Sequence, residues 1–313
     1  MGKVAFIFPG QGAQAVGMGK DIYETDSTAR GIFDAADAAL GFELSKIIFE
    51  GPDDELKKTV NTQPALLTTS VAYLELFRAK YGVQPDFVAG HSLGEYSALV
   101  AAGVLSFEDA VRTVRARGEF MEQAVPGGLG AMAAVLGAER DALQQLCQAV
   151  SKSGSVVELA NLNCPGQIVV SGSKEGVQAI VERGKEAGAK RVIPLEVSGP
   201  FHSSLMKPAS ERLAGVLAAV EMSSASVPVV ANVTARPVQR PDEVRHLLVE
   251  QVHSSVLWED SVAWLIEQGV DTFVELGSGT VLAGLVKKID RSVKVHSINS
   301  LEALEKFQSE TPV

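Results

Sequence analysis

The sequence predicts an α/β protein in which a parallel sheet, covered by helices, is interrupted by a smaller α/β unit. Up to about residue 122, short apolar runs alternate with longer stretches of helical periodicity, which is typical of parallel strands joined by helices. Between about residues 127 and 198 the predicted order changes to βαββαβ. The first alternation then resumes as far as residue 298. These observations indicate two units, one inserted into the other.

Short continuous apolar runs mark the strands of the first part, and a Pro or Gly residue follows each run. Such runs predict strands that are buried on both faces, as in a parallel sheet. The periodic stretches between them predict helices. The predicted elements are strands over residues 4–8 and 87–89 and helices over residues 28–40, 64–81, 93–105 and 107–122.

The middle of the chain has the element order of a ferredoxin-like unit. Two of its strands meet at Asn163-Cys164-Pro165-Gly166, which has the chemistry of a tight turn. Gly and Pro residues near both ends have the composition of hinges. We therefore expect a small domain over residues 127–198 and a large discontinuous domain over residues 1–126 and 199–313. The predicted elements of the small domain are strands over residues 130–136, 156–163, 167–172 and 191–197 and helices over residues 138–151 and 174–187.

The last part returns to the pattern of the first, and the tail over residues 307–313 is expected to fray. The predicted elements are helices over residues 203–220, 242–253, 259–268 and 281–288 and strands over residues 227–231, 272–276 and 293–298.

The composition excludes several classes of protein. Of the 313 residues, 46% are apolar and 21% are charged, as in ordinary globular domains. The net charge of −10 argues against a nucleic-acid partner, which needs a basic surface. The two cysteines, Cys147 and Cys164, cannot build a disulfide framework and fit a reducing compartment. Since neither a signal peptide nor a membrane-spanning run is present, we expect a cytoplasmic protein with no membrane partner. No metal-ligand spacing occurs, so no metal site is expected.

The strongest local signal is Gly90-His91-Ser92-Leu93-Gly94, which follows an apolar strand and precedes a helix. This is the context of a nucleophile elbow, a sharp turn that exposes a serine. Side chains two positions on either side of the serine would collide, and glycine removes that collision. At a helix N-terminus, backbone N–H groups also stabilise developing negative charge. The pattern predicts Ser92 as a nucleophile.

A serine nucleophile needs a base, and two histidines are candidates. His202 directly follows a predicted strand and precedes a helix. His296 lies in the last strand pattern, after an acid such as Asp271 or Glu275, as in the chain order of hydrolases. The residues alone favour neither histidine over the other.

Two further features supply candidate binding groups. Gly10-Gln11-Gly12 follows the first strand, as in dinucleotide-binding loops. Dinucleotide binding also requires an acidic residue at the end of a second strand about 20 residues later, and none occurs there. The loop can still supply an N–H group to a reacting oxygen. Arg112, Arg115 and Arg117 follow one another along a predicted helix. They form a solvated basic face, or one of them faces a pocket as a carboxylate clamp.

Three motifs together carry a family resemblance. They are Phe8-Pro9-Gly10-Gln11-Gly12-Ala13-Gln14, Gly90-His91-Ser92-Leu93-Gly94-Glu95 and Gly199-Pro200-Phe201-His202-Ser203. With them the chain resembles the malonyl-CoA:acyl carrier protein transacylases of bacterial dissociated fatty acid synthesis, from about residue 3 to residue 304. It is also similar to acyltransferase domains of polyketide synthases. The resemblance implies a hydrolase-like parallel-sheet core with a ferredoxin-like insert.

The resemblance also implies the chemistry. A malonyl group passes from malonyl-CoA to the phosphopantetheine thiol of acyl carrier protein through a malonyl-serine, in a ping-pong cycle that needs no permanently bound cofactor. The implied roles are nucleophile for Ser92, base for His202, oxyanion-binding N–H groups for Gln11 and Leu93, a carbonyl orienting the histidine for Gln251, and substrate binding for Arg117, Gln63 and Phe201.

Phe201 matches the malonyl-type signature, because bulk there would crowd the extra methyl group of methylmalonyl. Ser255 and Ser278 stand where relatives often have proline, and Ser255 could loosen the Gln251 carbonyl that holds His202. The carrier protein is expected to be acidic, so docking needs a local basic patch. Our candidates for this patch are Lys190, Arg191, Lys287 and Lys288.

Two alternatives stay open. A serine hydrolase or thioesterase would use Ser92 with His296 and an acid, and would need no Arg117. A catalytically silent docking module for acyl carriers would have no reason to keep Ser92, His202, Gln11 and Arg117 together. We expect the transacylase, working as a monomer on malonyl-CoA and acyl carrier protein.

Overall fold

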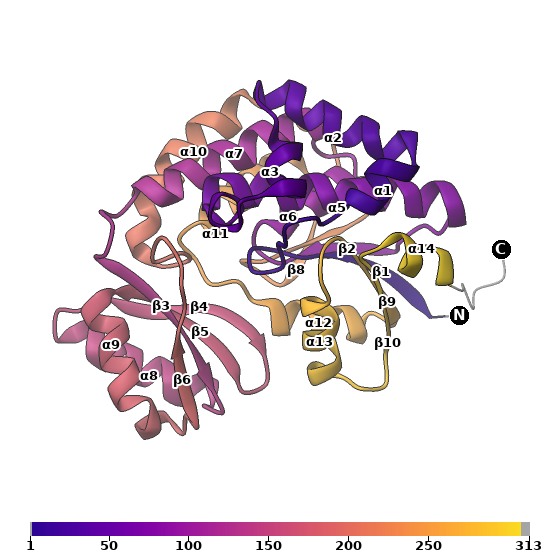
Figure 1. Ribbon diagram of the computed structural model, residues 1–313. Coiled ribbons are helices and arrows are strands. Elements are labelled where there is room, and N and C mark those ends of the chain that lie inside the picture. The colour runs from indigo at the N-terminus through magenta and orange to yellow at the C-terminus, as the bar shows by residue number, and fades with distance from the viewer. Residues whose placement is uncertain (1, 308–313) are drawn as a thin grey trace.

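The larger sheet joins the first and last parts of the chain in a computed structural model that describes residues 2–307 (Figure 1). Its strand order is β10-β9-β1-β2-β7-β8, and all neighbours are parallel except the antiparallel pair of β7 and β8. The predicted α/β class with a parallel core sheet is confirmed. The strands are β1 (Lys3–Phe8), β2 (Phe87–Gly90), β7 (Val229–Ala231), β8 (Arg236–Val238), β9 (Val270–Leu276) and β10 (Lys294–Ile298).

The continuous apolar run of β1 is explained by a core on each face of this sheet. Phe6 and Phe8 belong to one hydrophobic cluster, and Ala5 and Ile7 belong to another. Successive side chains of a strand point to opposite faces, so a strand between two cores must be apolar at every position. Figure 1 shows helices α1, α2, α5, α7 and α10 on one side of the sheet and α12 and α13 on the other.

The helices of this larger part agree with most of the predicted ranges. The short elements α1, α3, α4, α14 and β8 were not predicted, because a few residues carry too little periodicity. The helices are α1 (Lys20–Thr25), α2 (Ser27–Leu40), α3 (Leu44–Glu50), α4 (Asp53–Lys57), α5 (Thr59–Tyr81), α6 (Gly94–Ala101), α7 (Phe107–Gln123), α10 (Lys207–Ala219), α11 (Pro241–Gln251), α12 (Trp258–Glu267), α13 (Val281–Ile289) and α14 (Leu301–Lys306).

Helix α5 begins at Thr59, before the Pro64 at which the sequence placed its start. A proline inside a helix leaves the carbonyl four residues earlier without its N–H donor. Here that carbonyl belongs to Val60, and the Nη1 of Arg115 donates to it at 3.0 Å. A side chain of α7 therefore supplies the hydrogen bond that Pro64 removes.

The middle of the chain forms a second sheet with the strand order β4-β5-β3-β6, in which all neighbours are antiparallel. Helices α8 and α9 cover the side that faces away from the larger sheet (Figure 1). Val135, Leu143 and Val170 belong to a hydrophobic cluster of this unit's own. The division of the chain at residues 127 and 198 remains our proposal. The elements are β3 (Gly130–Leu136), α8 (Arg140–Lys152), β4 (Val157–Cys164), β5 (Gln167–Ser173), α9 (Lys174–Arg183), the 3₁₀ helix η1 (Gly184–Ala187) and β6 (Arg191–Pro194).

The second sheet is tied to the larger part through its edge strand β4. The backbone of Val256 accepts a hydrogen bond from Leu162 and donates one to Ala160. The hydroxyl of Ser255 donates to the carbonyl of Leu159 at 2.5 Å. Ser255 thus adds a hydrogen bond at the position where the sequence led us to expect loosening.

The C-terminal end of the described chain is packed. The ring of Phe307 lies 4.8 Å from Phe77, 4.9 Å from Tyr81 and 5.1 Å from His296, measured between ring centroids. The expectation that the tail frays from residue 307 is wrong for Phe307, because its ring has an aromatic pocket to enter. Residues 308–313 lie outside the described chain. Within residues 2–307, no helix is both long and apolar enough to cross a bilayer.

Candidate active site

Ser92 lies in the sharp turn between β2 and α6, with a backbone φ of +50°. A side-chain Cβ at Gly90 would lie 1.9 Å from the backbone of Gly94, and one at Gly94 would lie 2.1 Å from the carbonyl oxygen of Phe8. Both positions therefore require glycine. The glycines predicted from the motif are the residues that let the turn close and present the serine.

His202 is the histidine that the fold brings to Ser92. The Oγ of Ser92 lies 2.7 Å from the Nε2 of His202, and the Nδ1 of His202 lies 2.8 Å from the carbonyl oxygen of Gln251. That carbonyl only accepts, so it fixes the proton on Nδ1 and leaves the lone pair of Nε2 facing the serine. The geometry is that of a nucleophile with its base and a group that orients the base.

His296 lies elsewhere, so the triad of the hydrolase alternative is not assembled. It belongs to β10, and β9 and β1 separate that strand from β2, which puts roughly 14 Å between the two strands. Glu275 accepts hydrogen bonds from the N–H groups of Leu282 and Ala283. Its carboxylate therefore caps the start of α13.

Burial and the positive charge of Arg117 lower the pKa of His202 to about 3. The imidazole is therefore neutral near pH 7, as a base must be before it takes a proton. His91 points elsewhere, because its Nε2 lies 2.7 Å from the Oδ1 of Asn163.

Arg117 is the arginine of α7 that faces the site, and it is 1% exposed. Its Nη1 donates to the Oε1 of Gln63 at 2.7 Å, and its Nη2 donates to the Oγ of Ser92 at 3.1 Å and to the Oε1 of Gln251 at 3.0 Å. All three acceptors are neutral. A buried guanidinium without an anionic acceptor, in contact with the nucleophile, is suited to bind an acyl group that ends in a carboxylate.

The other two arginines of the helix have different partners. Arg112 donates to the carboxylate of Asp109 on the surface of α7. Arg115 donates to Asn61 as well as to Val60, at the start of α5. The sequence left open whether these arginines form a solvated face or a carboxylate clamp. The structure places Arg112 at the surface, Arg115 against the start of α5 and Arg117 in the wall of the site.

The backbone N–H group of Leu93 directly follows Ser92 in the same turn, and that of Gln11 lies in the loop after β1. Among residues 2–307, these two N–H groups donate to no other group of the protein. Both residues line a cavity of about 120 Å³, as do Ser92, His202 and Arg117. Apolar side chains complete its wall, namely Met121, Met132, Leu195, Val197 and Phe201.

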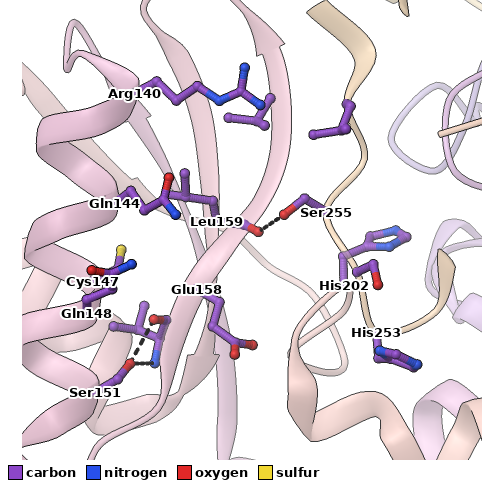
Figure 2. Close-up of a pocket in the computed structure, with 14 residues that line it drawn as sticks. Arg140, Gln144, Cys147, Gln148, Ser151, Glu158, Leu159, His202, His253 and Ser255 are labelled. Carbon is purple, nitrogen blue, oxygen red and sulfur yellow. Dashed lines mark hydrogen bonds between the residues drawn. The ribbon is translucent and has the colours of Figure 1, made fainter. Parts of the chain in front are cut away.

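A second pocket, of about 580 Å³, also reaches His202 (Figure 2). Figure 2 shows it between α8, strand β4 and the segment that carries His253 and Ser255. Arg140 on its wall binds Asp260 through two hydrogen bonds of 2.9 Å. The carboxylate of Glu158 accepts from the N–H of Ser204 at 2.6 Å and so ties β4 to the loop of His202.

Two buried polar residues complete the site, and sequence reasoning missed their importance. The Oδ1 of Asn232 accepts from the N–H of Ser92 at 2.7 Å, and its Nδ2 donates to the carbonyl of Gly90 at 2.7 Å. The carboxylate of Glu95 accepts from the N–H of Asn232 and from the Nε2 of Gln251. One signal for Asn232 was present, because it follows the carboxyl end of parallel strand β7, where ligands of α/β sheets bind.

The candidate docking residues divide into two groups. The Nζ of Lys288 donates to Gln167 at 3.2 Å, and both Gln167 and Arg191 pair with Leu136 in the second sheet. Lys190 packs where a side chain on Gly137 would stand. Lys190, Arg191 and Lys288 thus lie around one end of β3, and we call them the basic patch. The Nζ of Lys287 instead donates to the carbonyl of Val293 at 2.5 Å.

Comparison with known proteins agrees with this geometry. The family model described as "Acyl transferase domain" matches residues 5–311. The malonyl CoA-acyl carrier protein transacylase of Bacillus subtilis (strain 168) is 56% identical over 305 residues, which cover 97% of this chain and 96% of the relative. The protein of the same name from Staphylococcus aureus (strain MRSA252) is 50% identical over 302 residues, with coverages of 96% and 97%.

Solved structures agree as well. The acyl carrier protein S-malonyltransferase of Vibrio cholerae superposes with a TM-score of 0.94 at 42% identity, over 97% of this chain and 99% of that one. A malonyl-transacylase in complex with its type II PKS acyl-carrier protein superposes with a TM-score of 0.94 at 42% identity, over 97% of this chain and 98% of that one.

Proposed function

The chain belongs to the acyl transferase domain family, among the malonyl CoA-acyl carrier protein transacylases, and from this premise we propose that Ser92 carries the malonyl group between its two thiol carriers. The enzyme is an acyltransferase that moves malonyl from coenzyme A to acyl carrier protein for fatty acid synthesis. The observation that carries the proposal is the contact of the Ser92 hydroxyl with both His202 and Arg117. One atom thus meets a base and a carboxylate-binding group.

In the first half of the cycle, Ser92 Oγ attacks the thioester carbonyl of malonyl-CoA while its proton passes to Nε2 of His202. The N–H groups of Leu93 and Gln11 hold the oxyanion of the tetrahedral intermediate. The C–S bond then breaks, and the coenzyme A sulfur takes the proton from His202. A malonyl ester remains on Ser92, and His202 is neutral again.

In the second half, the phosphopantetheine thiol of the carrier protein gives its proton to His202 and attacks the ester carbonyl. The same N–H groups hold the second oxyanion, and the C–O bond breaks as Ser92 regains the proton. The acyl group travels on coenzyme A, serine and phosphopantetheine in turn, so the proposed cycle uses no permanently bound cofactor. All the proposed site residues come from one chain, so a monomer suffices.

Arg117 and Gln63 provide the selectivity for malonyl in this proposal. The malonyl carboxylate binds the buried guanidinium, which Gln63 holds in place through a hydrogen bond of 2.7 Å. An acetyl group would leave the guanidinium without an anion in direct contact. Sites built to pair a polar group reject the analogue that lacks it far more strongly than apolar pockets reject a size change.

The test is intact-protein mass spectrometry after brief mixing with malonyl-CoA, with acetyl-CoA and Ser92→Ala as controls. We expect a malonyl adduct that requires Ser92, is weak with acetyl-CoA and disappears when holo carrier protein is added. An adduct that water removes equally fast without carrier protein would support the hydrolase instead. Absence of any adduct would contradict a role for Ser92 as nucleophile.

We also propose that the basic patch of Lys190, Arg191 and Lys288 docks the acidic carrier protein. Charge reversal at Lys190, Arg191 or Lys288 should raise the apparent KM for carrier protein by roughly tenfold and leave that for malonyl-CoA unchanged. Lys287 was also a candidate, and its ammonium group keeps its charge while it donates to the carbonyl of Val293, so charge reversal there is measured in the same way. The matched control is Lys46→Glu, which reverses an exposed lysine on α3 of the larger part. Equal increases in both KM values, or an equal effect of Lys46→Glu, would contradict docking at this patch.

A further inference from the structure

Glu95 is a buried carboxylate that the proposed cycle does not use. It lies on α6, three residues after the nucleophile, and is 2% exposed. Its Oε2 accepts hydrogen bonds from the N–H of Asn232 at 3.0 Å and from the Nε2 of Gln251 at 2.9 Å. An ionised carboxylate in such a place needs a compensating positive charge.

That charge is Arg117, and the side-chain amide of Gln251 connects the two residues. Its Oε1 accepts from Arg117, while its Nε2 faces three acceptors, namely the carboxylate of Glu95, the carbonyl of Ser92 and the Oδ1 of Asn232. The opposite amide orientation would place the amide oxygen against these three acceptor oxygens and the amide nitrogen against the Arg117 donor. Glu95 and Arg117 therefore form a buried pair of opposite charges bridged by one amide.

We propose that Glu95 is the counterion of Arg117 in the unloaded enzyme, and that it takes up one proton from solvent when the malonyl carboxylate binds Arg117. The inference rests on the proposed function of Arg117 as the carboxylate clamp. The physical reason is that one buried cation cannot compensate two buried anions, and the substrate carboxylate stays ionised because it contacts the guanidinium directly.

The local electrostatics agree in direction. Burial raises the pKa of Glu95 to about 7, against the opposing effects of its hydrogen bonds and of Arg117. A second anion at Arg117 raises this pKa further. By linkage, the malonyl group binds more tightly when Glu95 is protonated, so its affinity falls as the pH rises through 7.

The other titratable groups around this pair keep their charge over the same range. Burial lowers the pKa of His202 to about 3, so its imidazole stays neutral, and burial also lowers the pKa of His91, which disfavours its protonation near neutral pH. Burial raises the pKa of Tyr96, next to Glu95 on α6, so its phenol stays neutral as well. Arg117 of α7 remains a cation. Among the described residues that face the pair, Glu95 is the group that titrates near neutral pH.

The experiment measures the dissociation constants of malonyl-CoA and acetyl-CoA by calorimetry between about pH 6 and about pH 9 in a Ser92→Ala background, which prevents acyl transfer. Acetyl-CoA carries the same titrating phosphate of coenzyme A but no acyl carboxylate. The ratio of the two dissociation constants therefore isolates the contribution that the malonyl carboxylate makes to binding at Arg117. We expect the preference for malonyl-CoA to fall by roughly tenfold over this range, the change that one unit of pKa shift produces.

Glu95→Gln keeps the oxygen that accepts from Asn232 and Gln251 and removes the charge. We expect the preference of this variant for malonyl-CoA over acetyl-CoA to be independent of pH. It should equal the preference that the Ser92→Ala parent shows at low pH. The matched control is Glu122→Gln, which removes a carboxylate from α7 that accepts from the N–H of Val60. This control should keep the pH dependence of the parent.

Proton uptake gives a second measurement that needs no variant at Glu95. Binding enthalpies are measured near neutral pH in two buffers of different ionisation enthalpy. They should show that the protein takes up more protons when it binds malonyl-CoA than when it binds acetyl-CoA. A strong malonyl preference without pH dependence or proton uptake would overturn the role of Glu95 and leave the clamp intact. No malonyl preference at any pH would instead overturn the clamp itself.

Discussion

The Oγ of Ser92 and the Nε2 of His202 lie 2.7 Å apart, although 110 positions separate the two residues in the chain. Both residues have a positive backbone φ, +50° for Ser92 and +58° for His202. Such a conformation costs a non-glycine residue on the order of 1–3 kcal/mol and persists where the surroundings enforce it. The hydrogen bonds of Asn232 to the serine turn and of Glu158 to the histidine loop are part of that enforcement.

The choice of base is tested by two histidine substitutions. His202→Ala should lower kcat for malonyl transfer by 10²–10⁴-fold or so, the usual contribution of a positioned base. His296→Ala should leave kcat within about twofold, because β10 lies at the far edge of the sheet from β2. Steady-state transfer to carrier protein measures both. The reverse pattern would revive the hydrolase-type arrangement.

The pH profile should lack the acid limb of an ordinary histidine. Burial and Arg117 lower the pKa of His202 to about 3, so the imidazole stays neutral as the pH falls through its usual value near 6.5. With both substrates saturating, we expect kcat to keep at least about half its value from about pH 7.5 down to about pH 5.5. A decline with a midpoint near 6.5 would show that the base titrates normally.

The glycines of the serine turn are required for steric reasons. Gly90→Ala places a Cβ 1.9 Å from the backbone of Gly94, which only a backbone shift can relieve. We expect the loss of transfer activity and a lower melting temperature. Gly215→Ala in α10 is the matched control, because its Cβ meets nothing within 4 Å, and it should stabilise the helix by about 0.5–1 kcal/mol.

Asn232 should be important for stability as well as for the site. Asn232→Ala leaves the N–H of Ser92 and the carbonyl of Gly90 without the partners that they have now. Each buried polar group left unpaired costs about 1–3 kcal/mol, so we expect the free energy of unfolding to fall by about 3 kcal/mol in urea denaturation. Asn299→Ala, which loses a single bond to the carbonyl of Gly279, should lose about 1 kcal/mol. Equal losses would contradict the central position of Asn232.

Phe201 should set the limit on acyl size. Its ring is 6% exposed and forms part of the cavity wall beside His202. Phe201→Ser should increase the loading of methylmalonyl relative to malonyl by roughly tenfold, because a methyl group in a pocket is worth about 1–3 kcal/mol. Competition between the two thioesters, read by intact mass, measures the ratio. An unchanged ratio in a variant that still loads malonyl would place the specificity elsewhere.

Much of the fold could be predicted because it depends on local order. The apolar runs of β1 and β2 identify strands buried on both faces, and the two glycines around Ser92 identify the turn between β2 and α6. The βαββαβ order appears in the sequence because each element carries its own periodicity. Short elements such as α4 escaped because a few residues carry too little periodicity. The start of α5 ahead of Pro64 escaped because a tertiary hydrogen bond from Arg115 supports it.

By itself, then, the sequence determined the elements, the serine turn and a short set of candidate bases and clamps. From the residues alone His202 and His296 stood equal, and a family resemblance was needed to prefer one of them. Only the tertiary structure showed that His202, Arg117 and Gln251 all hydrogen-bond to Ser92. It also showed that Asn232 hydrogen-bonds to Ser92 and that Glu95 hydrogen-bonds to Gln251. The physical reason is that periodicity reports which face of an element is buried. It does not report which distant side chain that face will meet.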